Sequence, residues 1–358
     1  MNALPAVNPA RAGVALVVLG VGGVGRALLE LLATPAAGAL QLVAIADSTR
    51  QWVNPRGIVP ARARRLLAAS VQPRDDEALL GALRDSGLVE QVIVDATASS
   101  AVAAHHADWL ARGCHVVSAN KAALGERLEG WQRLRHASRL GRRRYGDAAT
   151  VGAGLPVLST LLRLRQCGDR LRALDGVFSG SLSWLFNNFD GSRPFSALLH
   201  EARQRGYTEP DPRLDLGGAD VARKLLILAR AAGHAIDAHE VHVESLVPAG
   251  LREVTVEAFL ARASELDAPL EQRRAQAARE GRLLRLLARL DSQGRASVGL
   301  VAVEPTHPAA RLAGNDNLFA LTTVRYHDQP LVIQGPGAGA EVTAQALLGD
   351  VLALTADR

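Results

Sequence analysis

Short apolar runs that alternate with helix-like segments dominate the first part of the chain. The runs at residues 14–19 (VALVVL), 42–46 and 92–94 contain few polar positions, as buried strands do. Segments such as RALLELLA, between these runs, place apolar residues at helical spacing. Strands that alternate with helices over short connections predict a parallel sheet covered by helices. We therefore expect an α/β domain over residues 13–148, preceded by a flexible tail at residues 1–12.

The pattern changes after residue 148. The loop at 150–156 is rich in glycine and leads into a helix, and residues 174–179 read as a strand followed by a turn at Gly180 and Ser181. The other expected elements are a helix over 219–232 that ends at Gly233, mostly helical structure over 256–290, and strands at 297–303 and 321–324. These residues predict a second domain, over residues 149–332, in which strands and helices no longer alternate regularly.

Composition narrows the class of protein. Hydrophobic residues make up 48% of the chain and charged residues 22%, as in folded globular proteins. The formal charge of +5 comes from arginines scattered over predicted helices, and aromatic residues are only 4%, so we predict no nucleic-acid partner. The apolar runs are too short to span a bilayer and the first residues lack a secretory signal, so we predict no membrane association. Cys114 and Cys167 match no disulfide or zinc spacing, and we interpret both as buried thiols of a cytoplasmic protein.

A glycine-rich turn follows the first predicted strand. Its first, third and sixth positions have the G-x-G-x-x-G spacing, and the predicted helix begins directly after them. Glycine lets the backbone approach a pyrophosphate, and the helix start presents free N–H groups to that anion. The spacing alone is weak, and a tight turn without a ligand is the alternative, but a position between strand and helix is what dinucleotide binding requires. The predicted cofactor contacts are Gly20, Gly22, Gly23, Val24 and Gly25.

The end of the second predicted strand bears on the choice of cofactor. Asp47 is placed to accept a hydrogen bond from a ribose 2′-hydroxyl, which favours NAD. Ser48, Thr49 and Arg50 follow at once and could hold the 2′-phosphate of NADP instead. The choice between NAD and NADP therefore stays open.

Only two of the 41 basic residues are lysine, Lys121 and Lys224. Arginine stays protonated at any ordinary pH, whereas a lysine can be tuned to release a proton, so lysines kept against this bias are candidate acid–base groups. Lys121 and Thr97 each follow a predicted strand, at the edge where open α/β sheets bind ligands, and we expect both to face the cofactor. The alternatives are ordinary surface lysines and, for Thr97, a helix cap.

Carboxylates gather around Lys224. Glu209 and Asp215 lie in a proline-rich loop, and Asp220 precedes Lys224 by four residues, on the same face of a predicted helix. Such a group could hold a substrate ammonium and position a proton-transfer residue. The alternatives are a simple surface ion pair and a calcium loop, although the EF-hand spacing is absent.

Four segments carry a resemblance to a known family. They are ATVGAGLPV (149–157), GVFSGSLSWLFNNF (176–189), RGYTEPDPRLDLGGADVARKLLILAR (205–230) and GPGAGAEVTAQALLGDV (335–351). Through them the chain closely resembles homoserine dehydrogenase from about Gly13 to its end. The resemblance implies a Rossmann-type nucleotide-binding domain and an α+β substrate-binding and dimerisation domain with a mixed or antiparallel sheet. It also implies that residues 333–358 return to the nucleotide-binding domain.

The resemblance implies an activity as well. Members of the family interconvert L-homoserine and L-aspartate 4-semialdehyde with NAD or NADP, on the branch toward threonine, methionine and isoleucine. We expect a monofunctional enzyme, because the chain is too short to include an aspartate kinase domain and nothing after its last helix resembles a regulatory domain. Members of the family usually form homodimers through the sheet of the second domain, and we expect the same here.

The family's functional positions fall on specific residues of this chain. By resemblance, Lys224 exchanges a proton with the substrate oxygen, Lys121 assists between nicotinamide and substrate, and Asp220 positions the site. The family usually has threonine where Ser181 stands, a change that keeps the hydroxyl. The other implied contacts are Glu209 and Asp215 with the substrate amino group, Gly180, Ser181 and Tyr207 along the substrate pocket, and Gly339 with the cofactor.

A monovalent cation, usually sodium, is a further feature of the family. Backbone carbonyls at the positions of Val151, Ala153 and Leu155 hold it. The family's acidic residue three positions before the valine falls on Ala148 here, with Asp147 next to it. Cation binding therefore depends on whether Asp147 compensates.

Two other functions stay open. One is a homologue that binds the dinucleotide without catalysis, although the retained lysines and carboxylates argue against it. The other is a different semialdehyde or amino-acid dehydrogenase on the same fold. Aspartate-semialdehyde dehydrogenase would need a catalytic cysteine, and neither cysteine lies in a nucleophile context.

Overall fold

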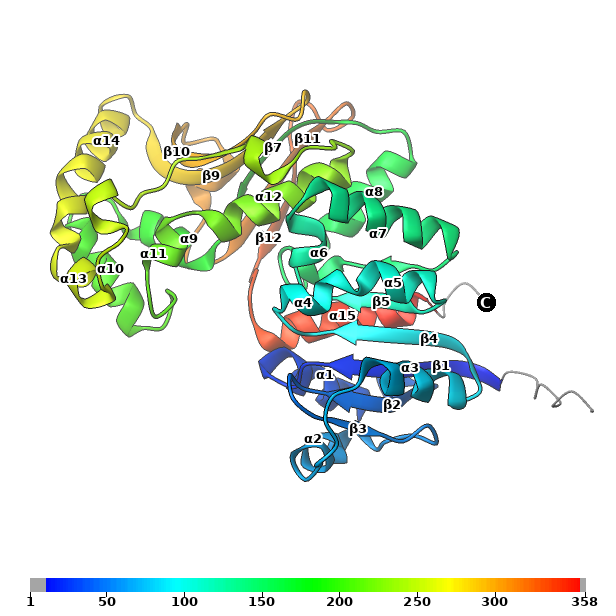
Figure 1. Cartoon of the computed structure of the whole chain (residues 1–358). Coiled ribbons are helices and arrows are strands. Elements are labelled where there is room, and N and C mark those ends of the chain that lie inside the picture. Colours follow the sequence, from blue (N-terminus) through cyan, green and yellow to red (C-terminus); the bar gives the residue numbers. More distant parts are fainter. Residues whose placement is uncertain (1–10, 355–358) are drawn as a thin grey trace, which may run out of the picture. The chain divides into compact units, whose positions relative to one another are not determined.

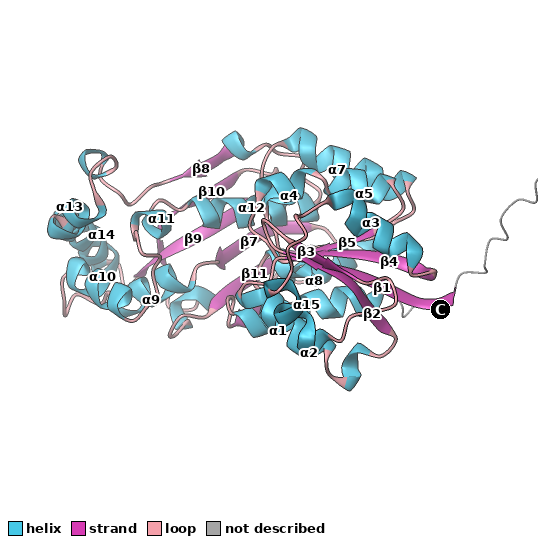
Figure 2. Ribbon diagram, turned by 60° about the horizontal axis from the view of Figure 1, so that its bottom comes forward, coloured by secondary structure: helices cyan, strands magenta, loops and turns pink. Residues whose placement is uncertain are grey.

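Six strands form the first sheet, in the spatial order β3-β2-β1-β4-β5-β6, as Figure 2 shows for its central part. The computed structural model of the protein describes residues 11–354. Neighbouring strands run parallel except β3, which pairs antiparallel with β2. Most residues of the central strands are apolar and buried, as expected where helices cover both faces. The strands are β1 (Arg11–Leu19), β2 (Leu40–Ala46), β3 (Gln51–Val53), β4 (Leu88–Asp95), β5 (His115–Ser118) and β6 (Tyr145–Gly146).

Helices α1 and α15 pack on each other and share a hydrophobic core with β1 and β2. The last helix therefore belongs to the first sheet, although the whole second sheet precedes it in sequence (Figure 1). The helices around this sheet are α1 (Gly23–Leu32), α2 (Pro60–Ala68), α3 (Asp76–Asp85), α4 (Ser100–Ala104), α5 (His106–Ala111), α6 (Ala122–Gly125), α7 (Leu128–Leu140) and α15 (Ala340–Ala353), with 3-10 turns η1 (Pro35–Ala37) and η2 (Ala148–Thr150).

Six strands also form the second sheet, in the order β12-β11-β7-β9-β10-β8. It is a mixed sheet, because β8 and β10 run parallel while the other neighbours are antiparallel. The strands are β7 (Leu171–Val177), β8 (Val241–Val243), β9 (Leu283–Asp291), β10 (Ala296–Val303), β11 (Asn317–Thr323) and β12 (Leu331–Gly335).

Helices α9 and α12 cover one face of the second sheet (Figure 1). Part of the opposite face is covered by η6, and the rest is open. The helices of this part are α8 (Val157–Gln166), α9 (Gly180–Asn188), α10 (Phe195–Gln204), α11 (Arg213–Leu216), α12 (Ala219–Ala232), α13 (Val256–Ala261) and α14 (Asp267–Arg279), with 3-10 turns η3 (Ala238–Glu240), η4 (Ala249–Leu251), η5 (Ala263–Leu266) and η6 (Pro308–Arg311).

The chain divides into two compact units, one around each sheet. The first unit comprises the residues up to Ala123, Glu129–Gly154 and the residues from Gly339 on; the second comprises Leu124–Leu128 and Leu155–Ala338. These divisions lie a few residues after the boundaries that the sequence predicts. Strand β1 begins at Arg11, inside the predicted tail, and the rest of that tail lies outside the described residues.

The expectation of mostly helical structure over residues 256–290 is wrong at its end. Helix α14 stops at Arg279, and residues Leu283–Asp291 form strand β9. The run LLRLLARL is apolar at almost every position because β9 lies between β7 and β10 and contributes buried leucines to both faces. Periodicity alone does not separate such a strand from a buried helix.

Two smaller expectations are also wrong. Gly180 and Ser181 do not form a turn after a strand, because they begin helix α9, which Ser179 caps. Cys114 is buried as expected, but Cys167 is exposed at the end of α8. Within residues 11–354, no helix is long and apolar enough to cross a membrane.

Candidate functional site

The glycine turn after β1 has the geometry that a phosphate-binding turn requires. Gly20 has a φ of +88°, and a β-carbon there would lie 2.9 Å from the Thr97 side chain. A β-carbon on Gly25 would collide with the Gly20 carbonyl, whereas one on Gly22 would meet nothing within 4 Å. Gly20 and Gly25 therefore allow strand and helix to approach closely, and Gly22 leaves open space at the start of α1.

A cavity of about 620 Å³ opens at the carboxyl ends of the first sheet's strands. Gly20, Asp47 and Thr97 follow β1, β2 and β4 respectively, and all three line this cavity. In sheets of this type, ligands bind at this edge, where the strand order reverses. With Gly22, which also lines the cavity, the structure thus brings together four residues that the sequence predicts as cofactor contacts. The other lining residues are Val21, Ser48, Arg74, Asp76, Ala98, Ser99, Ala101, Val102 and His105.

Asp47 is held by its own loop. Its Oδ1 accepts hydrogen bonds from the backbone N–H groups of Thr49 and Arg50, both at 2.8 Å, and its Oδ2 lies 3.4 Å from Arg50 Nε. Burial opposes ionisation, but these N–H groups hold the pKa of Asp47 below its ordinary value. On the same rim, Arg74 is paired with Asp76 at 2.9 Å. The loop therefore presents an ionised carboxylate to the cavity.

Thr97 and Lys121 lie at the same edge of the first sheet. The Thr97 backbone N–H donates to Asp95 Oδ1 at 2.8 Å, and its hydroxyl accepts from the Ser99 backbone N–H at 3.2 Å. Because Ser99 caps α4, the alternative of Thr97 as the helix cap is wrong. Lys121 follows β5 and is half-buried, directly after the buried Asn120.

Lys224 is the centre of a second group of residues, in the second unit. Its Nζ donates a hydrogen bond to the Phe178 carbonyl at 2.7 Å and lies 2.8 Å from Asp220 Oδ2. The lysine side chain is 12% exposed, whereas that of Asp220 is 51% exposed. The predicted i,i+4 pair is thus present, and Lys224 is not an ordinary surface lysine. A carbonyl and a carboxylate together fix the direction of its ammonium group.

Asp215 ties the proline-rich loop to helix α9. Its Oδ1 accepts from the Ser181 hydroxyl at 2.6 Å, and its Oδ2 accepts from the Glu209 backbone N–H at 2.9 Å. Ser179, which the sequence interpretation missed, lies 2.8 Å from the Ser181 hydroxyl and caps α9. A serine is a common N-cap, but this signal was not available here, because the sequence interpretation expected a turn and not a helix after Ser179.

The remaining predicted substrate residues surround this loop. The Glu209 side chain is exposed, and Tyr207 stacks obliquely on Trp184 with ring centres 5.5 Å apart. A β-carbon on Gly180 would lie 3.0 Å from the Asn315 carbonyl, so a larger residue there would crowd that carbonyl. The second unit thus presents a nearly buried lysine, three carboxylates and a serine hydroxyl on helices α9, α11 and α12 and on the loop before α11. Such a group can bind an ammonium group and exchange a proton.

The predicted cation ligands fall on both sides of the boundary between the units. Val151 and Ala153 belong to the first unit and Leu155 to the second. Ala153 has a φ of +53°, a conformation that L-residues rarely adopt, and the Leu155 carbonyl accepts from the Val157 N–H at 2.8 Å. Among residues 11–354, no group of three or more histidine, cysteine, aspartate or glutamate side chains could hold a metal.

Gly339, the implied second cofactor contact, caps the start of α15. Its φ is +131°, and its carbonyl accepts hydrogen bonds from the Thr343 backbone and hydroxyl at 3.1 and 2.6 Å. A β-carbon on Gly23 would lie 3.7 Å from the Ala340 side chain. The start of α15 therefore lies beside the glycine turn, as the resemblance implies.

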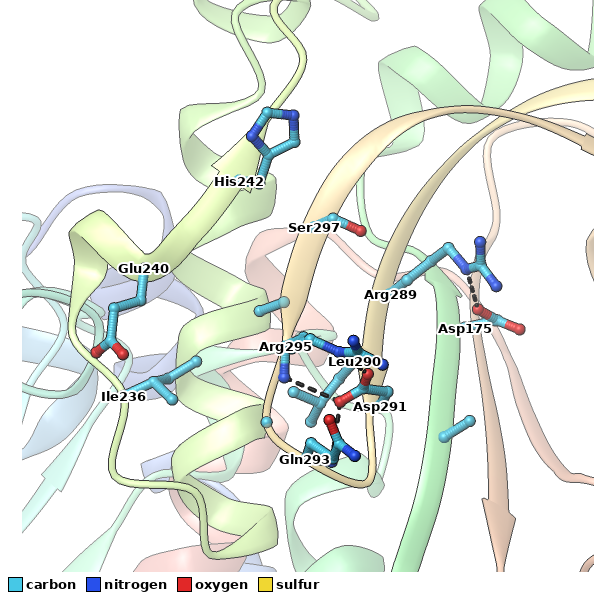
Figure 3. Close-up of a pocket in the computed structure, with 13 residues that line it drawn as sticks. Asp175, Ile236, Glu240, His242, Arg289, Leu290, Asp291, Gln293, Arg295 and Ser297 are labelled. Atoms are coloured by element: carbon cyan, nitrogen blue, oxygen red, sulfur yellow. Dashed lines mark hydrogen bonds and ion pairs between the residues drawn. The ribbon is translucent and has the colours of Figure 1, made fainter.

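A second cavity, of about 600 Å³, lies on the open face of the second sheet (Figure 3). Four of its charged side chains form two ion pairs: Arg289 Nε lies 3.0 Å from Asp175, and Arg295 Nε lies 2.5 Å from Asp291. No residue that the sequence predicts as functional lines it. We therefore place the candidate site at the two groups described above.

Comparison with known proteins relates most of the chain to one family. A family model described as homoserine dehydrogenase matches residues 156–352, and one described as the homoserine dehydrogenase NAD binding domain matches residues 20–145. Homoserine dehydrogenase of Schizosaccharomyces pombe is 35% identical over 363 residues, which cover 97% of this chain and 96% of that protein. A bifunctional aspartokinase/homoserine dehydrogenase of Zea mays is 40% identical over 94% of this chain. The chain spans 38% of that relative's length.

Solved structures agree on the fold. A Candida auris protein of unknown function has a TM-score of 0.90 and 33% identity, and the match covers 96% of this chain and 98% of that one. A hyperthermophilic archaeal homoserine dehydrogenase in complex with NADPH has a TM-score of 0.73 and 21% identity, over 97% of this chain and 99% of that one. Together, the two family-model matches and the relative that aligns over nearly its whole length show that this chain belongs to the homoserine dehydrogenase family.

Proposed function

We propose that this protein catalyses the NAD(P)-dependent interconversion of L-homoserine and L-aspartate 4-semialdehyde. The observation that carries the proposal is the setting of Lys224, whose nearly buried Nζ contacts the Phe178 carbonyl and Asp220. A lysine in this setting suits proton exchange with a substrate oxygen, and the family supplies the reaction. The alternative of a dinucleotide-binding homologue without catalysis does not account for this placement of Lys224.

Lys224 is the proposed acid–base group. When L-homoserine is oxidised, its hydroxyl proton passes to Nζ of Lys224 in its neutral amine form as the carbon–oxygen double bond forms, and the amine becomes the ammonium. In the reverse direction, the lysine ammonium polarises the aldehyde oxygen and returns the proton to it. Bound NAD(P) supplies the hydride acceptor or donor. Asp220 directs Nζ, and Lys121 is proposed to assist by stabilising negative charge on the oxygen.

The proposed substrate contacts are those of the proline-rich loop. Glu209 and Asp215 would pair with the substrate ammonium, since carboxylates are its natural partners. The hydrogen bond from Ser181 to Asp215 supports this role, because it orients one carboxylate oxygen. Gly180 and Tyr207 would line the rest of the pocket.

The glycine turn and its cavity support dinucleotide binding in the first unit. Gly20, Gly22, Gly23, Val24 and Gly25 would hold the pyrophosphate. The other proposed contacts are Asp47 with the adenosine ribose, Thr97 and Lys121 toward the nicotinamide, and Gly339 from the start of α15. The ionised carboxylate of Asp47 favours NAD over NADP, since it would repel a 2′-phosphate.

Three further properties are proposed: a bound cation, a homodimer and a biosynthetic setting. A monovalent cation at the carbonyls of Val151, Ala153 and Leu155 would explain why Ala153 adopts a conformation that costs an L-residue about 1–3 kcal/mol. A homodimer would cover the open face of the second sheet, where the Val332 side chain is 40% exposed. The proposed setting is the biosynthesis of threonine, methionine and isoleucine in the cytoplasm.

Steady-state kinetics test the proposal. Purified protein is assayed with L-homoserine and with L-aspartate 4-semialdehyde, each with NAD(H) and with NADP(H), in sodium or potassium buffers and with or without threonine. We expect turnover in both directions with at least one cofactor. Cofactor binding without turnover of either substrate would establish the idle homologue instead, and turnover of a different hydroxy amino acid alone would establish another dehydrogenase.

A further inference from the structure

A cluster of buried polar side chains lies at the edge of the first sheet where its strands end, next to the proposed cofactor contacts Thr97 and Lys121. We call this edge the cofactor edge. Asp95 and His106 are fully buried, and Asn120 is 2% exposed. They come from the end of β4, the start of α5 and the residue before Lys121. Buried polar groups are costly unless they are hydrogen-bonded, so a cluster of this kind requires an explanation.

Asp95 is the centre of the cluster. Its Oδ2 accepts hydrogen bonds from His106 Nε2 at 2.9 Å and from Asn120 Nδ2 at 3.0 Å. Its Oδ1 accepts from the Thr97 backbone N–H at 2.8 Å. One carboxylate thus connects α5, the residue before Lys121 and the proposed cofactor contact Thr97.

Asn120 holds the backbone on both sides of Lys121. Its own N–H donates to the Ser118 hydroxyl at 2.9 Å, and its Oδ1 accepts from the Ala122 N–H at 3.0 Å. Its Nδ2 also donates to the Ser99 carbonyl at 2.9 Å. The position of the Lys121 backbone is therefore set by a side chain that Asp95 orients.

Tyr145 completes the cluster from strand β6. His106 Nδ1 lies 3.0 Å from the Tyr145 hydroxyl, and the imidazole packs between the rings of Tyr145 and Trp109, with centroids 5.7 and 5.5 Å away. Because a carboxylate only accepts, His106 Nε2 is the donor to Asp95. In the tautomer with its proton on Nε2, Nδ1 is an acceptor for the tyrosine hydroxyl. Burial raises the pKa of Tyr145, which keeps its hydroxyl protonated as that donor.

A second buried histidine provides a contrast within the same strands. His115 is 6% exposed, and its Nε2 lies 2.9 Å from Glu90 Oε2. This pair lies toward the amino ends of β4 and β5, and the hydrogen bonds of its histidine go to Glu90, Arg143 and the Arg144 backbone. His115 therefore pairs with a carboxylate, as His106 does, but it lies at the opposite end of these strands from Thr97 and Lys121.

We propose that His106 and Tyr145 are positioning residues for the cofactor edge: through Asp95 and Asn120 they hold Thr97 and Lys121 in place for cofactor binding and hydride transfer. The catalytic part of this inference rests on the proposed function, whereas the cofactor-binding part does not. Neither residue lines the cavity, so both act through their neighbours. Groups that bind a cofactor productively need this kind of support, because small displacements weaken binding and slow the reaction.

The test compares His106→Phe with His115→Phe in the full-length protein. Each change removes one buried histidine–carboxylate pair, so both variants should lose thermal stability to a similar degree. Binding of NADH and NADPH is measured by fluorescence titration, well below the melting temperature. We expect about tenfold weaker binding for His106→Phe and a change within twofold for His115→Phe.

A milder variant covers the case in which His106→Phe does not fold. Tyr145→Phe removes only the hydroxyl, and we expect about threefold weaker cofactor binding. With L-homoserine as substrate, His106→Phe and Tyr145→Phe should lower kcat by a larger factor than they raise the KM for the amino acid. His115→Phe should not show this difference. The proposal would be overturned if His106→Phe and His115→Phe lost the same amount of cofactor affinity, or if Tyr145→Phe bound the cofactor as the wild type does. Absence of turnover in every variant and in the wild type would remove the proposed function but leave the binding comparison decisive.

Discussion

Lys224 differs from the chain's many arginines in what its side chain can do. A guanidinium could make the same contacts with the Phe178 carbonyl and Asp220, but it does not release a proton at ordinary pH. If Lys224 transfers the proton as proposed, the requirement for lysine comes from proton transfer and not from charge. A conservative substitution of Lys224 therefore separates the two effects.

We predict that Lys224→Arg keeps the fold and loses turnover. The charge at this position is retained, so the melting temperature should change little, whereas kcat should fall by about 100- to 10,000-fold because general acid–base catalysis is lost. Circular dichroism and steady-state kinetics measure the two effects. The reciprocal change Arg163→Lys, at an exposed position on α8, serves as the control. Near-normal activity of Lys224→Arg would exclude it as the proton-transfer group.

The Asp47 carboxylate leads to a prediction about cofactor choice. Replacing it by serine in Asp47→Ser removes the negative charge that is proposed to face the adenosine ribose and to repel a 2′-phosphate. The ratio of kcat/KM with NADP to that with NAD should rise by about tenfold, equivalent to about 1.4 kcal/mol. The control is Asp85→Ser, on the exposed side of α3 and outside the cavity. An unchanged ratio would show that Asp47 does not contact the ribose.

Two acidic residues, Asp350 on helix α15 and Asp147 before η2, lie close together in the first unit. Asp350 Oδ2 accepts a hydrogen bond from the Ala148 backbone N–H at 2.9 Å, at the end of β6 and the start of η2. Burial raises the pKa of Asp350 to about 6, although this hydrogen bond opposes the shift. Burial and the nearby Asp350 raise the pKa of Asp147 to about 7, with Arg135 on α7 acting in the opposite direction.

We predict that the stability of the protein falls as pH rises from about 5 to 8. In this range the folded state still binds protons that the unfolded state has already released, since an exposed aspartate titrates near pH 4. For each such proton, the free energy of unfolding decreases by about 1.4 kcal/mol per pH unit. Asp350→Asn keeps an acceptor for the Ala148 N–H and removes one charge, so its melting temperature should depend less on pH.

Thermal melts of the wild type, Asp350→Asn and the surface control Asp85→Asn at several pH values measure this effect. The control should follow the wild-type curve. If Asp350→Asn followed it too, the acidic pair would not be the source of the pH dependence.

At the scale of the whole molecule, the main feature is the open part of the second sheet's face, around the cavity of Figure 3. We predict that this face forms the interface of a homodimer. Ala173→Arg would place a bulky charge in the cavity and should shift the protein from dimer to monomer in sedimentation velocity. Ala278→Arg, at an exposed position on α14, is the matched control and should remain dimeric. A wild type that sediments as a monomer would remove the dimer from the proposal.

Prediction from sequence succeeded where the signal was local. The glycine turn follows a strand and opens a helix, and the expected helix over 219–232 coincides with α12, including its left-handed end at Gly233. Asp220 and Lys224 face each other because four residues make about one helical turn. Prediction failed at β9, where burial on both faces removes the alternation that marks a strand.

The sequence by itself determined the class of the two units, the family and the lysines and carboxylates of the site. These features depend on short-range spacing and on residue type, both of which are visible along the chain. Only the tertiary structure decided which groups support them: the Phe178 carbonyl at Lys224, Ser181 at Asp215, and the His106–Tyr145 pair beneath the cofactor edge. These partners lie 34 to 46 residues apart in sequence. Their contacts arise from strand order and helix packing, and no local pattern encodes such distances.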